Sequence, residues 1–124
     1  MATSSSNEPT RVETWRARAS VYSGRPDPEW DLDQELVKRL LEMWEQMEPS
    51  HSAPPHPPGL GYRGAVLESS EGKWFSAYNG AVQLTAGKSV LVREDSGRDF
   101  ERLILQSAPP STLPPFVRGS LERE

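Results

Sequence analysis

The chain has 124 residues, which is the size of one domain. It contains no cysteine, and this excludes disulfides, a thiol nucleophile and thiolate-bound metal centres. Acidic residues outnumber basic ones by 18 to 14, and the net charge of −4 disfavours a protein that coats nucleic acid or anionic lipid. Most of the 12 prolines fall within 49–58 and 109–115, so the remaining chain resembles an ordinary small domain.

Residues 1–10 do not have the pattern of a secretory or membrane-targeting signal. Residues 1–10 are small and polar, lack a basic stretch followed by an apolar one, and are expected to form a disordered tail. No window approaches the roughly 18 apolar residues of a membrane-spanning helix. We therefore expect a cytoplasmic protein with no membrane association.

After the tail, apolar and polar residues alternate along the chain. Trp15, Ala17 and Ala19 fall on one face with polar residues between them, which predicts a half-buried strand over about residues 14–22. Residues 23–28 then place two prolines around an aspartate. Proline cannot continue a strand ladder, so a corner is predicted there.

The clearest element is an amphipathic helix over 32–48, where apolar residues recur at spacings of three and four. Two starts fit its chemistry. Asp31 with Gln34 would form a capping box, whereas Asp33 as the N-cap would let Leu32 pack back onto the helix.

Pro49 ends this helix, and the proline-rich residues 49–61 predict a semi-rigid surface loop. The chain's two histidines, His51 and His56, lie in that loop. A zinc site normally needs three or four protein ligands, so no metal is expected.

Residues 62–93 predict an antiparallel meander. Asn79-Gly80 is its strongest hairpin signal, because both residues tolerate a positive φ. A short helix follows with Asp95 or Ser96 as its cap, and Pro109-Pro110 stops it. The tail beyond is expected to be extended, pinned to the body by one or more of its apolar residues, namely Phe116, Val117 or Leu121.

These elements predict an α+β domain. Antiparallel strands must bury their apolar face under the helices, which gives a two-layer sandwich of about four strands and two helices in the order β-α-β-β-β(-β)-α. The expected organisation is a disordered tail at 1–10, one domain at 11–108 with the loop at 49–61, and a tail at 109–124. One open edge on so small a sheet is compatible with a homo-oligomer.

The corner before the helix is the predicted binding site. Arg25, Asp27, Glu29 and Trp30 bring a guanidinium, two carboxylates and an indole into a segment stiffened by two prolines. A loop already ordered loses little entropy on binding, and Arg25 could fork onto a carboxylate or phosphate. The alternative is purely architectural. In that case Arg25 pairs with one of the carboxylates, and Trp30 covers the end of the core.

Three separated segments share a likeness to known sequences. Tyr22–Trp30 reads Y-S-G-R-P-D-P-E-W, residues 61–64 read G-Y-R-G, and Gly97-Arg98 precedes F-E-R-L at 100–103. Over roughly residues 20–105 they resemble a group of small, uncharacterised bacterial proteins that carry the motif Y-S-G-R-P-[DN]-P-x-W. This resemblance implies no activity, ligand or partner.

The sequence offers little support for a cofactor site or a nucleic-acid-binding surface. Gly59, Gly61 and Gly64 imitate part of a dinucleotide-binding motif but precede a strand, so no cofactor is expected. Arg16 and Arg18 alternate on the first strand, yet the acidic balance opposes a nucleic-acid partner. The sequence therefore favours a non-catalytic binding or accessory protein acting through protein–protein contacts. The alternative is a small enzyme that uses Asp27 or Glu29, with Arg25 as a substrate anchor.

Overall fold

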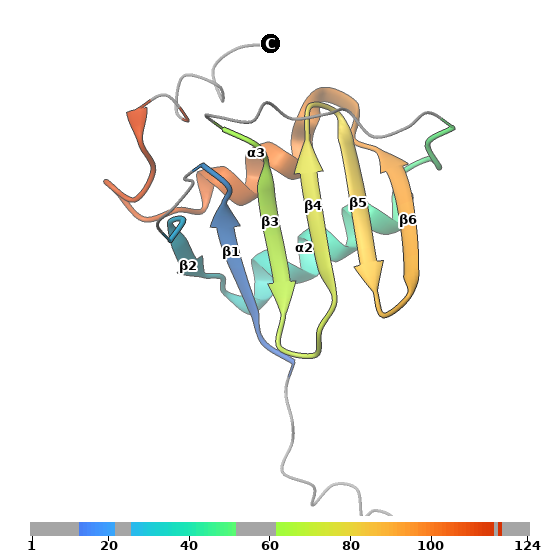
Figure 1. Cartoon of the computed structure of the whole chain (residues 1–124), viewed down its shortest axis with the longest axis horizontal. Helices are drawn as coiled ribbons and strands as arrows, with labels where there is room; N and C mark the ends of the chain where they lie inside the picture. The colour runs from blue at the N-terminus through green and yellow to red at the C-terminus, as the bar shows by residue number, and fades with distance from the viewer. Residues whose placement is uncertain (1–12, 22–25, 52–61, 116, 118–124) are drawn as a thin grey trace, which may run out of the picture.

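The computed structural model describes residues 13–21, 26–51, 62–115 and 117. An antiparallel sheet with the strand order β2-β1-β3-β4-β5-β6 forms its centre (Figure 1). The strands are β1 (Trp15–Ala19), β2 (Glu29–Asp31), β3 (Ala65–Ser69), β4 (Trp74–Tyr78), β5 (Ala81–Ala86) and β6 (Ser89–Glu94). The helical elements are α2 (Gln34–Gln46), the short 3-10 helix η1 (Ser96–Arg98) and α3 (Asp99–Gln106).

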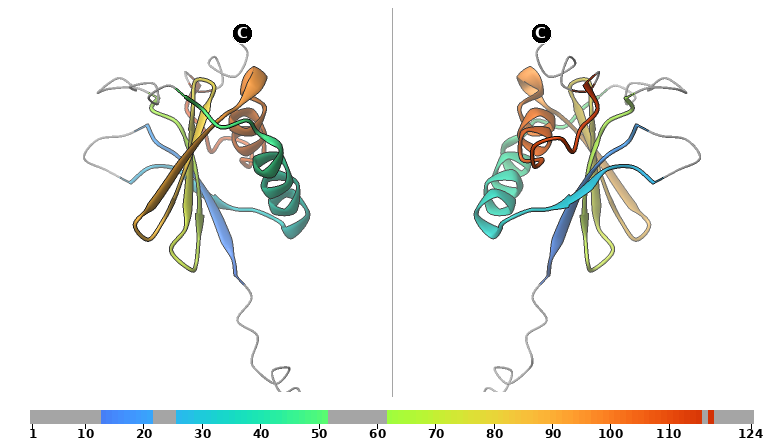
Figure 2. Two further views of the ribbon diagram at one scale, coloured as in Figure 1. Left: turned by 90° about the vertical axis from the view of Figure 1, so that its right-hand side faces the viewer. Right: turned by 90° about the vertical axis from the view of Figure 1, so that its left-hand side faces the viewer.

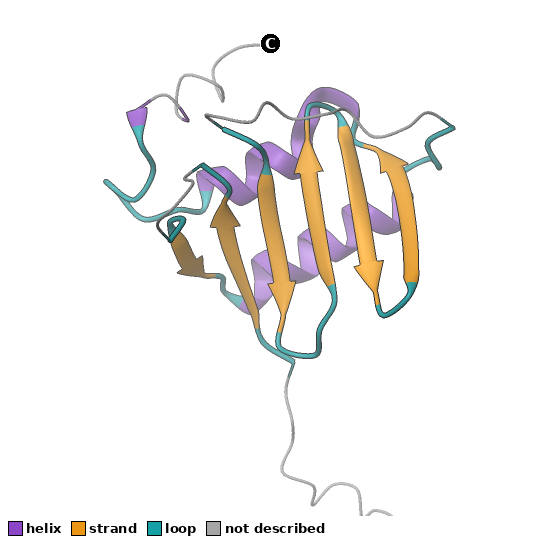
Figure 3. Cartoon of the chain, viewed as in Figure 1, coloured by secondary structure: helices purple, strands orange, loops and turns teal. Residues whose placement is uncertain are grey.

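Both α-helices cover the same face of the sheet, so the molecule has two layers (Figures 2 and 3). The end of the sheet where β4 passes into β5 lies at the top of Figure 1 and is called the upper end below. The end where β5 passes into β6 is the lower end. The predicted α+β class with two helices is confirmed, but the sheet has six strands rather than about four.

β2 is the strand that the sequence pattern did not predict. The chain turns back after β1, and Trp30 pairs with Ala17. Pro26 and Pro28 suggested a corner without regular structure, but both precede the strand. Moreover β2 is a three-residue edge strand, which is where neighbouring prolines are tolerated.

Asp33 settles the start of α2. Its carboxylate accepts a hydrogen bond of 2.9 Å from the Leu36 N–H, so the second of the two predicted starts is confirmed. The buried stripe of the helix consists of Val37, Leu40 and Trp44. This stripe faces the sheet and α3.

An aromatic cluster fills the centre of the core. The ring of Phe75 on β4 lies 5.2 Å from Trp44, 5.7 Å from Phe100 and 6.0 Å from Trp15, measured between centroids. Such aromatic contacts add to the stability that burial alone provides. Phe75 thereby joins both helices to the sheet.

Short side chains line the sheet beside this cluster. Four alanines on its helix-facing side are fully buried, namely Ala17, Ala19, Ala65 and Ala77. They leave room for α3, which contacts β3 and β4. Phe100 and Ile104 of α3 are fully buried and face the sheet.

The chain after α3 returns to the core. Leu113 is 8% exposed and Val117 is fully buried. Val117 was one of the three residues expected to pin this segment, whereas Phe116 and Leu121 lie outside the described residues. The expected tail at 1–10 and most of the loop at 49–61 also lie outside them.

Candidate functional site

The carboxylates of the predicted corner contact the backbone and the arginines of the first strand. Asp27 accepts a hydrogen bond of 2.9 Å from the Val21 N–H, and its carboxylate lies 3.9 Å from Nε of Arg18. Glu29 forms an ion pair with Arg16 at 3.4 Å. Each carboxylate therefore has a partner within the fold.

Trp30 belongs to the interior. It is 4% exposed, and its Nε1–H donates a hydrogen bond of 2.8 Å to Oγ of Ser107, just beyond α3. Its predicted role of covering the end of the core fits this position. Arg25 lies outside the described residues, so recognition by this corner stays a prediction.

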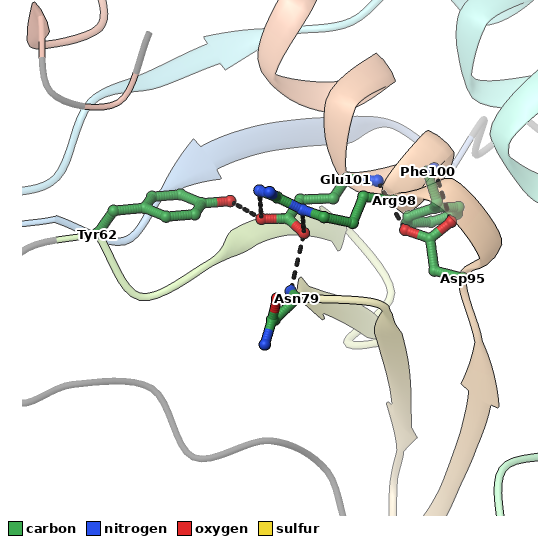
Figure 4. Close-up of polar contacts among 6 residues, drawn as sticks. All are labelled: Tyr62, Asn79, Asp95, Arg98, Phe100 and Glu101. Carbon is green, nitrogen blue, oxygen red and sulfur yellow. Dashed lines mark hydrogen bonds and ion pairs between the residues drawn. The ribbon is translucent and has the colours of Figure 1, made fainter. Parts of the chain in front are cut away.

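A polar cluster that the sequence analysis did not predict lies at the upper end of the sheet (Figure 4). Its centre is Glu101, whose side chain is fully buried. Arg98 donates from Nε to one carboxylate oxygen and from a terminal nitrogen to the other, both at 3.1 Å. The Tyr62 hydroxyl and the Asn79 N–H, the latter at 2.9 Å, also donate to this carboxylate.

The donors come from three separate segments. Tyr62 precedes β3, Asn79 stands in the β4–β5 turn, and Arg98 immediately precedes α3. Asn79 and Arg98 both have left-handed backbone conformations, with φ of 50° and 60°. The buried carboxylate therefore ties the start of α3 to two connections of the sheet.

Asp95 organises the start of α3. Its carboxylate accepts hydrogen bonds from the N–H groups of Phe100 at 2.9 Å and Glu101 at 3.1 Å. These N–H groups lie in the first turn of the helix and have no partner within it. Asp95, one of the two predicted caps, thus bonds the first turn of α3 from the residue before η1, whereas the residue at the N-cap position of α3 itself is Arg98.

Burial sets the protonation states in this cluster. It is the main cause that raises the pKa of Tyr62 far above its ordinary range, and the neighbouring Glu101 raises it further. The hydrogen bonds to Glu101 raise the pKa of Arg98. Tyr62 therefore stays a neutral donor and Arg98 a cation, and the contacts that Glu101 makes with them hold the fold together.

A close backbone crossing lies beside this cluster. The Ser20 N–H donates to the Gly64 carbonyl, and the Arg63 N–H donates back to the Ser20 carbonyl. Gly64 has a φ of +129°, and a Cβ there would lie 2.9 Å from the Ala77 carbonyl oxygen, so glycine is required. The segment 62–64 therefore combines a close backbone crossing at Gly64 with the Tyr62 hydroxyl that reaches Glu101.

The lower half of the β6 edge is the second notable site. The Val92 carbonyl and the Glu94 N–H face away from β5, since they bond to residues 48–50, and Val90 lies two residues before Val92 in the same register. The N–H and C=O of Val90 therefore point away from β5, toward the edge. No other backbone group among the described residues bonds to them.

The upper half of the same edge is covered by the chain itself. The Ser50 N–H donates to the Val92 carbonyl at 2.9 Å, and the Glu94 N–H donates to the Glu48 carbonyl at 2.8 Å. Pro49 forms the bridge to Arg93 between these bonds. Residues 48–50 thus occupy half of the position that a seventh strand would take.

Large apolar side chains are exposed beside the open half. Val90 is 55% exposed, Leu91 is 50% exposed, and Trp74 is 41% exposed. Trp74 and Val90 flank Thr85 in one row on the helix-free face. Leu91 points to the other face, so the strand end presents apolar surface on both sides.

A groove of about 550 Å³ lies between α2 and the lower half of the sheet. Leu41, Phe75 and Leu84 are among its apolar lining, and Glu42 and Glu45 line it from α2. Leu84 pairs directly with Leu91. The groove and the exposed Leu91 are therefore on the same face of neighbouring strands.

Comparison of the chain with protein-family models, curated proteins and solved structures gave no match. Within the described ranges, no group of three or more His, Asp or Glu side chains is arranged to hold a metal ion. The described helices include none that is long and apolar enough to cross a membrane.

Sequence reasoning missed both the Glu101 cluster and the open edge. A signal for Glu101 existed, because it follows Phe100 and the apolar Ile104 and Leu105 lie three and four residues after it. With that spacing Glu101 falls on the buried stripe. The half-covered edge had no such signal, since the pairing of Pro49 with Arg93 depends on tertiary structure.

Proposed function

We propose that this protein is a non-catalytic binding protein that acts through protein–protein contacts, taking an extended segment of a partner onto the open half of the β6 edge. The observation that carries the proposal is the outward-facing N–H and C=O of Val90, beside a half-filled strand position. An added strand would pair with them and continue the line begun by residues 48–50. This is recognition by strand addition.

Side chains support the same site. A strand laid along β6 would cover Val90 on the helix-free face and Leu91 on the helix face, and each is about half exposed. Main-chain hydrogen bonds would supply affinity, and contacts with alternate side chains would supply selectivity. Burial of apolar surface adds roughly 25 cal/mol per Å².

The enzyme alternative has less support. It needs Asp27 or Glu29 as a reacting carboxylate, but the first lies beside Arg18 and the second beside Arg16. Two expectations from the sequence are part of this proposal: the binding protein needs no cofactor, and it acts in the cytoplasm.

Site-specific photo-crosslinking tests the proposed surface. The full chain, expressed in its host cells, would carry p-benzoylphenylalanine at Leu91 or, as a control, at the exposed Glu35 of α2. We expect a discrete crosslinked product from the first position only. A product of twice the chain's mass would identify a second copy as the source of the segment.

Val90→Pro sharpens this test. Proline removes the outward N–H but no hydrogen bond to β5, so the fold should survive while the crosslink is lost. Val90→Thr retains the N–H and should keep the crosslink. Equal products at Leu91 and Glu35, or a product that persists in Val90→Pro, would overturn the proposal.

A further inference from the structure

The helix-free face of the sheet divides into a charged half and an uncharged half. Two rows of side chains cross this face from β2 to β6, one near the lower end and one in the middle. On β2, β1 and β3 the two rows consist of Asp31, Arg16, Glu68, Glu29, Arg18 and Val66. On β4, β5 and β6 they consist of Trp74, Thr85, Val90, Ser76, Gln83 and Val92. Five of the first six residues are charged, and none of the second six is.

We propose that the second set of six residues, called the neutral patch below, is the surface through which two copies of this chain form a dimer. None of the six side chains is buried, and Trp74 and Val90 are 41% and 55% exposed. Both α-helices lie on the other face of the sheet (Figure 2). Pairing through this patch does not require the proposed strand addition, because the edge N–H and C=O groups point sideways within the sheet.

The composition of the neutral patch is that of an interface. The solvated face of an antiparallel sheet is normally polar, and charged residues make up 26% of this chain. Charged residues are depleted, and tryptophan is enriched, at the centres of protein interfaces. On the charged half, by contrast, Arg16 forms ion pairs with Glu29 at 3.4 Å and Asp31 at 3.5 Å. That half has the composition of a surface that stays in water.

A two-fold axis along β5 makes the neutral patch complementary to itself. The two subunits of a two-fold dimer use the same patch, and two sheets that pack face to face keep their strands within about 30° of each other. An axis parallel to β5 places β4 of one copy over β6 of the other. Trp74 then lies over the partner's Val90, so a large ring meets an exposed branched side chain.

Charge favours a second copy at this face over any other face of the chain. Each copy has a net charge of −4, so two copies repel each other unless the surfaces that meet are uncharged. With the axis on β5, the strands β1 to β3 of the two copies extend beyond the overlap on opposite sides, and Glu68 stays in water. Gln83 lies opposite the partner's Gln83, where each amide can both donate and accept a hydrogen bond.

The size of the patch predicts a weak dimer. It spans roughly 14 Å across three strands and roughly 17 Å along them. A surface of this size falls below the roughly 800 Å² per partner that a standard stable interface buries. We therefore expect a dimer that forms at about 10–100 μM and dissociates on dilution.

Sedimentation equilibrium of the purified full chain tests the pairing. The average mass should rise toward twice that of one chain as the concentration increases from about 5 to about 500 μM. Gln83→Lys places two like charges at the axis and should weaken dimerisation at least about tenfold. Gln46→Lys adds the same charge at an exposed position of α2 and should leave dimerisation unchanged.

A mixture of two variants tests the two-fold geometry. Gln83→Glu alone should also prevent pairing, whereas an equimolar mixture of Gln83→Lys and Gln83→Glu should dimerise, because opposite charges then face each other across the axis. Circular dichroism and the unfolding midpoint establish that each variant folds. If either does not, the same two substitutions at Thr85, the other residue beside the axis, provide the test.

Three results would overturn the inference. The first is a wild-type chain that stays monomeric at every concentration. The second is a dimer that Gln83→Lys and Gln46→Lys affect equally, which would place the interface elsewhere. The third is a mixture of the folded Lys and Glu variants that stays monomeric while the wild type dimerises, because the residue would then not face its own copy.

Discussion

The two ends of the sheet handle polar groups in opposite ways. At the upper end, the buried Glu101 carboxylate receives donors at both oxygens from Arg98, Tyr62 and Asn79. At the lower end, the main-chain groups of Val90 face outward between apolar side chains. The upper end therefore holds elements of one chain together, whereas the lower end has the features of a surface that meets another chain.

This contrast separates stability from binding. Buried charges are tolerated only when they are paired and hydrogen-bonded, so changes at the upper end should be costly to folding. Exposed apolar residues at a strand end contribute little to folding, so changes at the lower end should chiefly alter association.

The largest expected effect is that of Glu101→Ala. It removes the acceptor for Arg98 and Tyr62 in a buried site, and should lower the free energy of unfolding by about 3–5 kcal/mol. Urea denaturation measures this loss, with the exposed Glu71→Ala expected to cost under about 0.5 kcal/mol.

If Glu101→Ala does not fold, the milder Tyr62→Phe deletes one donor and should cost about 1–3 kcal/mol. Losses as small as that of Glu71→Ala at both positions would contradict the view that this cluster stabilises the fold.

A smaller effect concerns Asp95, whose pKa burial raises above the ordinary value of 3.8 despite the two backbone hydrogen bonds. The folded state then binds a proton more readily than the unfolded state, so this group's contribution to stability falls as the pH rises above 3.8. Unfolding of the wild type and Asp95→Asn across this range should show the wild type losing stability relative to the variant. A constant difference would show that burial does not perturb Asp95.

The smallest effect is expected at the lower end. Val90→Thr keeps the branched shape and the N–H of a side chain that is 55% exposed, so the free energy of unfolding should change by under about 0.5 kcal/mol. The unfolding midpoint in urea measures it. A loss comparable to that of Tyr62→Phe would mean that the lower end is part of the core.

Local chemistry explains which elements the sequence predicted. Asp33 can cap α2 because its side chain reaches an N–H three residues away, and Asn79-Gly80 can turn because both adopt a positive φ, at 50° and 96°. Such signals lie within a few residues. The helix, the hairpin and the buried face of β1 were predictable for this reason.

Long-range contacts explain the rest. Tyr62 and Glu101 are 39 residues apart, and nothing in the sequence near either residue predicts their contact. β2 is a strand because it pairs with β1, whereas Pro26 and Pro28 just before it predicted a corner without regular structure. Val90 is an unremarkable strand residue in the sequence, and only the partial cover by residues 48–50 distinguishes it.

The sheet has two edges, and they differ in what they permit. The outer strand β2 is only three residues long, follows Pro28, and exposes Glu29 and Asp31, which discourages any further pairing. A chain of molecules joined strand to strand can grow only if each molecule has two sheet edges that are free to pair. Because β2 disfavours pairing, a segment bound at β6 would leave no second edge for another molecule. Strand addition at β6 would therefore not propagate into a fibril.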